Sequence, residues 1–308
     1  MDFLSLVGNT PLIELKHCVP KPGVRLFAKL EGQNPTGSIK DRIVAFMLAE
    51  ARRTGRLRPG QVIVEASTGN TGIALAMIGR RLGYPVRVVA PDTIYPGVAR
   101  MLRMYGADVD WVAGARGIER AMDRAREMAE HESAFLLNQF GSLDNPRCHY
   151  ETTAVEILAA CPHVDAFVCG LGTGGTIMGI GQRLKEANPE VQLVAAEAFP
   201  GDQLQGLQSM TSGYLPPILD LSVPDSKILV NAANAFRAVH EILAREGIVV
   251  GPSSGAVMHA ARQWVQRIER GNIVLMFADS GWKYLNSPNL EPDKLPADEG
   301  TLDDVLWW

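Results

Sequence analysis

Apolar residues in this chain follow two patterns that alternate along its length. Short, nearly continuous apolar runs are typical of buried strands, and each is followed by a segment whose apolar positions recur at the spacing of one helix face. Residues 62–141 show this alternation repeatedly, with strands expected at 62–66, 86–90 and 109–112 and helices expected at 71–82, 97–105 and 118–131. Strands that alternate with helices in this way predict a doubly wound, mostly parallel sheet.

A second series of the same kind follows residue 141. Its expected helices lie at 146–160, 176–187, 232–246 and 253–268, and its expected strands at 166–169, 191–196 and 273–278. A chain of 308 residues is too long for one ordinary core. We therefore predict two α/β domains, residues 1–143 and 144–308, with the first ~35 residues able to pack on the second domain.

One long segment between these elements shows neither pattern. Residues 200–227 are rich in Pro, Gly and Ser and have no clear period. Long loops inside compact domains usually carry function, so we expect this segment to form part of the substrate entrance.

Composition narrows the class of protein. Hydrophobic residues make up 46% and charged residues 21% of the chain, as in an ordinary globular enzyme. A net charge of -4 gives no basic field for nucleic acid. No apolar run approaches the roughly 20 residues that span a bilayer, and no basic leader precedes an apolar segment, so we expect a cytoplasmic protein.

The four cysteines do not form a recognisable metal site. Cys18, Cys148, Cys161 and Cys169 include no Cys-x-x-Cys pair and have no histidine at zinc-ligand spacing. We expect them to be buried, reduced side chains, and we expect no metal.

A lysine at the start of an expected helix is the first candidate for chemistry. The turn-rich segment 34–42 leads into an apolar helix and places Lys40 in its first turn, with Ser38 as a candidate cap. A cation there opposes the helix dipole by ~0.3–1 kcal/mol. The dipole and burial both disfavour a protonated amine, which suits a Schiff-base lysine or a proton carrier. For this segment alone a solvated lysine offset by Asp41 is the better explanation, so other motifs must decide.

Two strand-to-helix turns add candidate ligand groups. The first follows strand 62–66, and its hydroxyls and backbone N–H groups suit an anion such as an amino acid's carboxylate, although they also suit a well-capped turn. The second is the glycine-rich segment 170–176, whose backbone can approach a phosphate closely. A third segment, 251–255, is explained by helix capping alone. The first turn contains Ser67, Thr68, Gly69, Asn70 and Thr71, and the second contains Gly172, Thr173, Gly174, Gly175 and Thr176.

The glycine-rich turn also satisfies a rival pattern. Gly170, Gly172 and Gly175 have the spacing of a dinucleotide fingerprint, and Glu197 ends the next strand where a ribose-binding acid would lie. An NAD-dependent oxidoreductase is therefore an alternative from a different class. It explains neither Lys40 nor the first turn.

Taken together, these segments resemble the cysteine synthase (O-acetylserine sulfhydrylase) family, B-type, of the fold-type II pyridoxal-phosphate enzymes. The resemblance implies the tryptophan synthase β-like fold and spans nearly the whole chain in the family's order. It rests on residues 8–12, 29–31, 34–42, 69–72, 172–176 and 251–255.

The resemblance implies a role for each candidate residue. Lys40 would carry pyridoxal 5'-phosphate as a Schiff base and remove the α-proton, and Asn70 would contact the cofactor's phenolic oxygen. Ser253 would contact its pyridine nitrogen, and a neutral partner there suits β-elimination. The phosphate cradle would consist of Gly172, Thr173, Gly174, Gly175 and Thr176, and the substrate would be bound by Ser67, Thr68, Gly69, Thr71 and Gln139. Where the family usually has Thr-Ser, this chain has Ser67-Thr68.

The implied reaction is a β-replacement that makes L-cysteine from O-acetyl-L-serine and sulfide or another sulfur donor. Enzymes of the family that prefer O-phosphoserine have an arginine where this chain has Gln208, which favours acetate as the leaving group. Cystathionine synthase, serine or threonine dehydratase and diaminopropionate synthase share the lysine chemistry and stay open. A catalytically silent binding protein is a further alternative.

The resemblance also implies partners. Relatives are usually homodimers, and the C-terminal segment resembles enzymes supplied by a thiocarboxylated sulfur-carrier protein, so such a protein is a candidate partner. We further predict that Trp307 and Trp308 fold back over the active-site entrance and shield the reaction intermediate. A loose terminus is the alternative.

Overall fold

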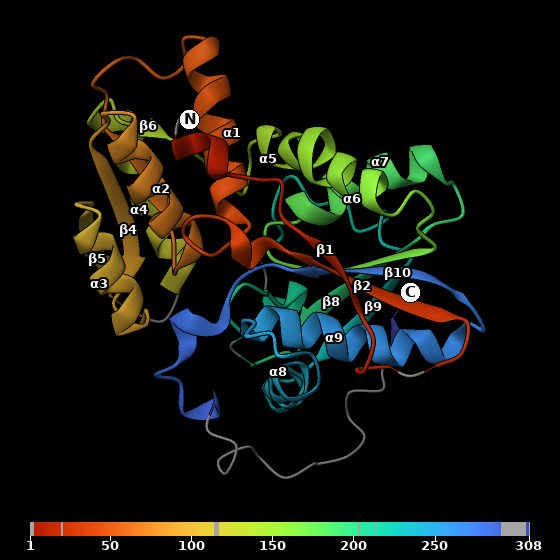
Figure 1. The fold of residues 1–308 in the computed structure, drawn as a ribbon. Helices are drawn as coiled ribbons and strands as arrows, with labels where there is room; N and C mark the ends of the chain where they lie inside the picture. Colours follow the sequence, from red (N-terminus) through yellow and green to blue (C-terminus); the bar gives the residue numbers. More distant parts are fainter. Residues whose placement is uncertain are drawn as a thin grey trace. The chain divides into compact units, whose positions relative to one another are not determined.

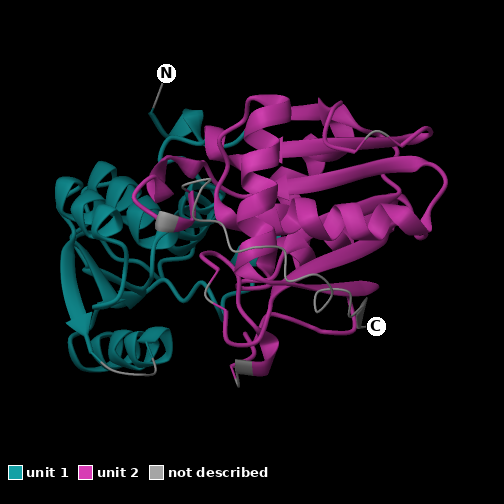
Figure 2. Cartoon of the chain, turned by 90° about the horizontal axis from the view of Figure 1, so that it is seen from below, with its two compact units in different colours: residues 1–8, 34–148 teal, residues 9–33, 149–308 magenta. Residues whose placement is uncertain are grey.

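The computed structural model describes residues 3–19, 21–113, 117–202, 204–212, 214–290 and 306–307. The chain divides into two compact units, which Figure 2 colours teal and magenta. Unit 1 comprises Met1–Gly8 and Asn34–Cys148, and unit 2 comprises Asn9–Gln33 and His149–Trp308. Each unit has its own sheet and its own hydrophobic core.

Unit 1 contains a parallel sheet of four strands in the order β5-β4-β3-β6. Helices α2 and α4 both pack on β3 and β4, and α1 packs on α2 (Figure 1). The strands are β3 (Ile63–Ala66), β4 (Val86–Pro91), β5 (Asp108–Val112) and β6 (Phe135–Leu136), and the helices are α1 (Lys40–Arg53), α2 (Asn70–Arg81), α3 (Pro96–Met104), α4 (Gly117–His131), α5 (Asp144–Cys148) and the 3-10 turn η1 (Phe3–Leu6).

The core of unit 1 explains why its sequence is so apolar around residue 75. All four residues of β3 are buried, and helix α2 is buried continuously from Thr71 to Gly79. A Cβ on Gly79 would lie 2.3 Å from Val86 Cγ2, so only glycine lets α2 approach β4 this closely. Glu65 is the exception in this strand, because it is a carboxylic acid that the core encloses.

Unit 2 contains a sheet of seven strands in the order β1-β2-β10-β7-β8-β9-β11. Its five central strands are parallel, and β1 and β11 pair antiparallel at the two edges. Within the unit, α6 and α7 lie on one side of the sheet, and α9 packs on the other side with α8 behind it (Figure 1).

The element bounds of unit 2 are as follows. The strands are β1 (Leu12–Leu15), β2 (Val24–Leu30), β7 (Ala166–Gly170), β8 (Gln192–Ala198), β9 (Ser226–Val230), β10 (Gly271–Phe277) and β11 (Leu306–Trp307). The α-helices are α6 (Ala154–Ala160), α7 (Gly175–Ala187), α8 (Ala232–Glu246) and α9 (Pro252–Trp264). Short turns are η2 (Glu31–Gln33), the π-helical η3 (His149–Thr153), η4 (Met210–Ser212), η5 (Val265–Arg267), η6 (Gly281–Tyr284) and η7 (Pro288–Leu290).

Strand β2 does not follow the apolar pattern and was not predicted from the sequence. It carries Lys29, whose side chain is only 1% exposed. The ammonium group lies 2.6 Å from a carboxylate oxygen of Glu156 and 2.5 Å from the carbonyl oxygen of Thr10. A buried cation with two such acceptors is tolerated, so a strand can form where a charge interrupts the apolar run.

The expected helix 146–160 consists of three pieces, and the unit boundary lies inside it. Helix α5 ends at Cys148, the π-helical turn η3 follows, and α6 begins at Ala154. His149 is fully buried, and its Nδ1 lies 3.0 Å from Thr153 Oγ1 within the wider turn. The predicted boundary at 143/144 therefore differs from the observed one at 148/149, and residues 3–8 belong to unit 1.

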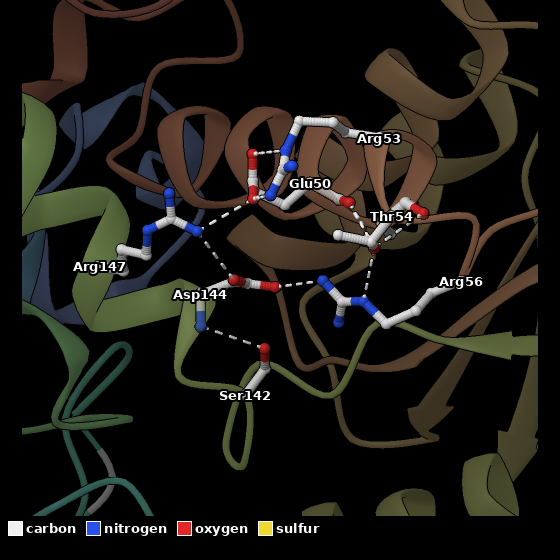
Figure 3. Close-up of polar contacts among 8 residues, drawn as sticks. Glu50, Arg53, Thr54, Arg56, Ser142, Asp144 and Arg147 are labelled. Carbon is white, nitrogen blue, oxygen red and sulfur yellow. Dashed lines mark hydrogen bonds and ion pairs between the residues drawn. The ribbon is translucent and has the colours of Figure 1, made fainter.

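An ion-pair network explains why α5 belongs to unit 1. Glu50 on α1 lies between Arg53 and Arg147, at 2.7 Å and 3.0 Å, and Arg56 lies 2.6 Å from Asp144 (Figure 3). These contacts join the C-terminal end of α1 to α5.

Among the described residues, no helix has the length and apolar character needed to cross a bilayer.

Candidate active site

Lys40 is the first residue of α1, as its turn-rich preceding segment predicts. Its backbone N–H donates to Ser38 Oγ at 3.3 Å, and its side chain is half-buried. The neighbouring Asp41 is fully buried and accepts hydrogen bonds from the backbone N–H and the hydroxyl of Thr36. Asp41 thus ties the turn 34–37 to the helix that presents Lys40, which a solvated lysine–aspartate pair would not require.

The turn after β3 is closed by the hydroxyl of Ser67. This oxygen accepts the backbone N–H groups of Gly69 at 3.1 Å and Gly72 at 2.9 Å. Ser67 is buried, whereas Thr68 is exposed. The two hydroxyls therefore differ: Ser67 builds the start of α2, and Thr68 is available to a ligand.

Gln139 lies against the same turn although it is distant in sequence. Thr71 Oγ1 donates to Gln139 Oε1 at 2.6 Å, and Gln139 Nε2 donates to the carbonyl of Ala66 at 3.2 Å. The carbonyl of Gln139 accepts from Asn145 Nδ2 at 2.8 Å. The structure thus brings together the predicted substrate residues of unit 1, and Asn70 begins the helix beside them.

Beneath this turn lies a carboxyl group that the sequence analysis did not single out. Glu65 is 2% exposed, and its Oε2 accepts the backbone N–H of Gln139 at 3.4 Å. Burial raises the pKa of Glu65 to about 8, against smaller opposite effects from nearby backbone N–H groups. A polar residue inside an otherwise apolar run was the available signal.

In unit 2, the glycine-rich turn has the build of a phosphate site. Gly174 has φ 86° and precedes α7, and the Gly175 N–H donates to Thr173 Oγ1 at 3.3 Å. A Cβ on Gly174 would lie 2.8 Å from Leu219 Cβ, and one on Gly172 would lie 2.7 Å from the carbonyl oxygen of Gly206. The packing around Gly172 and Gly174 thus leaves no room for side chains, and the turn lies at a helix N-terminus, where an anion is favoured.

Thr176 in this turn contacts His149, the residue that follows the unit boundary. Its Oγ1 lies 3.4 Å from His149 Nε2, the ring nitrogen opposite the one that contacts Thr153. His149 therefore fixes one hydroxyl of the predicted cradle, a contact that no sequence pattern indicated.

The loop 204–208 covers the same turn and reaches Ser253. Gly206 has φ 88°, and a Cβ there would lie 3.4 Å from Ser253 Cβ. The N–H of Gln208 donates to the carbonyl of Leu171 at 2.8 Å, and Gln208 Oε1 is buried without a hydrogen-bond partner among the described residues. Part of the expected entrance loop thus lies against the predicted cradle and Ser253, the buried residue near the start of α9.

Glu197 does not have the surroundings of a ribose-binding acid. It is fully buried, accepts the N–H of Met210 at 2.7 Å and lies 3.0 Å from the ammonium group of Lys227. The carboxylate therefore holds the loop 200–227. Glu197 is therefore not placed to bind a ribose, as the NAD interpretation requires.

Two further expectations concern cysteines and the tail. All four cysteines are buried free thiols, and burial raises the pKa of Cys18 to about 12 and that of Cys169 still further. No cluster of three potential metal ligands occurs in the described ranges.

Leu306 and Trp307 pair with Ile228 and Lys227 as the edge strand β11, and Trp308 lies outside the described residues.

The chain has relatives along nearly its full length. A family model described as "Pyridoxal-phosphate dependent enzyme" matches residues 3–279. Cysteine synthase B of Escherichia coli is 36% identical over 282 residues, which cover 91% of this chain and 93% of that protein. A probable cysteine synthase of Bacillus subtilis is 38% identical over 296 residues, covering 92% and 95%.

Solved structures agree with these relatives. A hydrogen sulfide-producing enzyme from Fusobacterium nucleatum has a TM-score of 0.87 at 36% identity, covering 92% of this chain and 99% of that one. The structure of O-ureido-L-serine synthase has a TM-score of 0.89 at 34% identity, covering 96% of each chain.

Proposed function

The chain belongs to the pyridoxal-phosphate dependent enzymes of the cysteine synthase family, and from this premise we propose that it makes L-cysteine by β-replacement on O-acetyl-L-serine. When bound, pyridoxal phosphate supplies the electron sink that acidifies the α-carbon of an amino acid and lets its β-substituent leave. The observation that carries the proposal is the turn 172–176, a glycine-rich turn at the N-terminus of α7 in which Gly172 and Gly174 have no room for a Cβ.

The candidate residues fit this cofactor chemically. Gly172, Thr173, Gly174, Gly175 and Thr176 would hold its phosphate through backbone N–H groups and hydroxyls at a helix N-terminus. Ser253 would contact its pyridine nitrogen, Asn70 would contact its phenolic oxygen, and Lys40 would attach it covalently.

Lys40 is also the proposed base for the α-proton. It is half-buried at the start of α1, where the helix dipole opposes a positive charge. The buried Asp41–Thr36 contact fixes the turn that precedes it.

The substrate's carboxylate is proposed to bind at the turn after β3. Thr68, Gly69, Thr71 and Gln139 lie together at this turn and would contact the carboxylate, while Ser67 keeps the turn closed. The exchange of Thr-Ser for Ser67-Thr68 moves a methyl group but keeps both hydroxyls, of which Ser67 would serve the turn and Thr68 the ligand.

The leaving group and the sulfur donor are the finer parts of the proposal. The backbone N–H of Gln208 donates to the carbonyl of Leu171, which places a neutral side chain beside the glycine-rich turn. A neutral side chain favours acetate over a phosphate group that needs a cation. Sulfide is the simplest donor, and a sulfur-carrier protein is an alternative donor. We further propose a homodimer, to be tested by sedimentation, and a cytoplasmic location, which suits four reduced buried thiols.

A spectral titration tests the substrate. O-acetylserine, O-phosphoserine and serine are each added to the purified holoenzyme, and the visible band and the turnover with sulfide are recorded. We expect O-acetylserine to shift the band at the lowest concentration and to give the highest kcat/KM. Faster turnover of O-phosphoserine than of O-acetylserine would show that phosphate, not acetate, is the leaving group. A protein that binds no pyridoxal phosphate would overturn the proposed function.

A further inference from the structure

Glu65 is a fully enclosed carboxylic acid to which the proposed reaction assigns no step. It is the third residue of β3, between Val64 and Ala66, and only 2% of the residue is exposed. Its strand neighbour across the sheet is Val88 of β4. Burial of a carboxyl group among apolar residues is costly, so its place here requires a specific function for its oxygens.

The carboxyl group faces the start of the turn 138–142. Besides the N–H of Gln139 at 3.4 Å, the backbone N–H groups of Asn138 and Ala66 interact favourably with it. Asn138 has φ 59°, a conformation that non-glycine residues rarely adopt. Its carbonyl accepts the N–H groups of Gly141 at 3.1 Å and Ser142 at 2.9 Å. Glu65 thus satisfies the donors at the beginning of a strained turn.

Hydrogen bonds fix both the backbone and the side chain of Gln139 in this turn. The backbone of Gln139 is fixed by Glu65 on one side and by Asn145 on the other. Its side chain is fixed by Thr71 at 2.6 Å and by the carbonyl of Ala66 at 3.2 Å. Any shift of the Gln139 backbone therefore moves the amide that contacts Thr71.

We propose that Glu65 is a positioning residue that fixes Gln139, and through it Thr71, in the arrangement that binds the substrate carboxylate. The proposal rests on the proposed function for the identity of that ligand. Because burial raises the pKa of Glu65 to about 8, the group is mainly protonated at neutral pH. A neutral acid can accept from the turn without placing a negative charge behind a carboxylate site.

Three substitutions separate the hydrogen-bonding role from packing. Glu65→Gln keeps a neutral acceptor of the same shape, Glu65→Leu keeps the volume without an acceptor, and Glu65→Asp withdraws the carboxyl group by one methylene. Glu130→Gln removes an exposed carboxyl group on α4 and serves as the control. Each variant is also tested for thermal unfolding.

The first readout is ligand binding. The Kd of L-alanine, which has no leaving group, is measured from the visible band of the holoenzyme together with KM for O-acetylserine and for sulfide. We expect Glu65→Leu to raise Kd and the O-acetylserine KM about tenfold, the effect of one buried hydrogen bond, with kcat and the sulfide KM within about twofold. We expect Glu65→Gln to stay within about twofold of the wild type.

The second readout does not need the cofactor. Hydrogen exchange of apo-enzyme peptides that contain residues 138–142 is expected to be about tenfold faster in Glu65→Leu and unchanged in Glu65→Gln and Glu130→Gln. The proposal is overturned if Glu65→Leu leaves both the exchange rate and the Kd for L-alanine unchanged. It is also overturned if Glu65→Leu lowers kcat and raises the sulfide KM by the same factor by which it raises Kd.

If Glu65→Leu does not fold, Glu65→Asp decides the question. A several-fold rise in Kd for L-alanine supports the proposal, and an unchanged Kd overturns it. A wild-type protein that binds no amino acid at all would refute the proposed function instead, and the exchange experiment would still test the contact between Glu65 and the turn.

Discussion

The turn after β3 in unit 1 and the turn after β7 in unit 2 have the same strand-turn-helix topology but are built by opposite means. Side-chain hydrogen bonds hold the first, with Ser67 Oγ accepting two backbone N–H groups and Gln139 accepting from Thr71. The second is held by close backbone packing, with Gly172 against Gly206 and Gly174 against Leu219. We therefore expect the first turn, the proposed carboxylate site, to tolerate extra volume better than the second, the proposed phosphate site, whose backbone is closely packed.

The largest effect is expected from adding one methyl group to the second turn. Gly174→Ala introduces a Cβ at φ 86° and 2.8 Å from Leu219 Cβ, so the turn must deform. We expect cofactor affinity to fall about 100-fold, because several backbone donors move together. Gly247→Ala is the control, since Gly247 also has a positive φ but no described atom lies within 4 Å of the added Cβ. Equal cofactor affinities of the two variants would remove the distinction.

Removing a hydroxyl from the first turn should have a smaller effect, on stability for Ser67 and on substrate binding for Thr68. Ser67→Ala leaves the N–H groups of Gly69 and Gly72 without their acceptor and should lower the free energy of unfolding by about 1–2 kcal/mol. Thr68→Ala removes an exposed hydroxyl and should leave unfolding unchanged while raising KM for O-acetylserine. Denaturant unfolding and steady-state kinetics measure the two effects, and the opposite assignment would contradict the account.

The two glutamates of unit 1 with shifted pKa values should respond to pH in opposite directions. The pKa of Glu65 is raised from 4.5 to about 8, so the folded protein keeps a proton that the unfolded chain releases. Stability attributable to Glu65 therefore falls as the pH rises from about 4.5 to 8, by up to about 1.4 kcal/mol per unit. Urea unfolding of Glu65→Gln across this range should show a flatter pH dependence than the wild type, and an unchanged slope would contradict the buried, protonated state.

Glu50 is expected to give the smallest effect, and in the acid range. Hydrogen bonds from Arg53 and Arg147 lower its pKa from 4.5 to about 2 (Figure 3). The stability that it contributes is present above about pH 4.5 and is lost as the pH falls toward 2. Glu50→Gln should therefore be closest to the wild type at low pH and less stable at neutral pH. Arg120→Gln, which changes an exposed arginine on α4 outside the network, is the control.

The sequence predicted those parts of the structure in which local pattern and tertiary environment agree. Strands β3, β4 and β7 are buried along both faces, so their apolar runs were sufficient. Strand β2 was missed because Lys29 is buried through Glu156, a partner that lies far away in sequence. The boundary at Cys148 was missed because α5 joins unit 1 through ion pairs with α1 that no local pattern contains.

The candidate site was predictable to a similar limit. Lys40 at the start of α1 and the glycine-rich turn before α7 followed from spacing and turn chemistry. The different burial of Ser67 and Thr68 did not, because only the fold determines which hydroxyl points inward. Glu65 and His149 contact turns that tertiary contacts create, so no spacing indicated these contacts, and the one local signal for Glu65 was a polar residue within an apolar run.

The central claim is that Lys40 carries pyridoxal phosphate. The most direct measurement is borohydride reduction of the purified holoenzyme, followed by proteolysis and mass spectrometry of the labelled peptide. The account predicts a single phosphopyridoxyl group on Lys40 and none in Lys40→Ala. A label on another lysine, or a wild-type protein that takes up no cofactor, would contradict it.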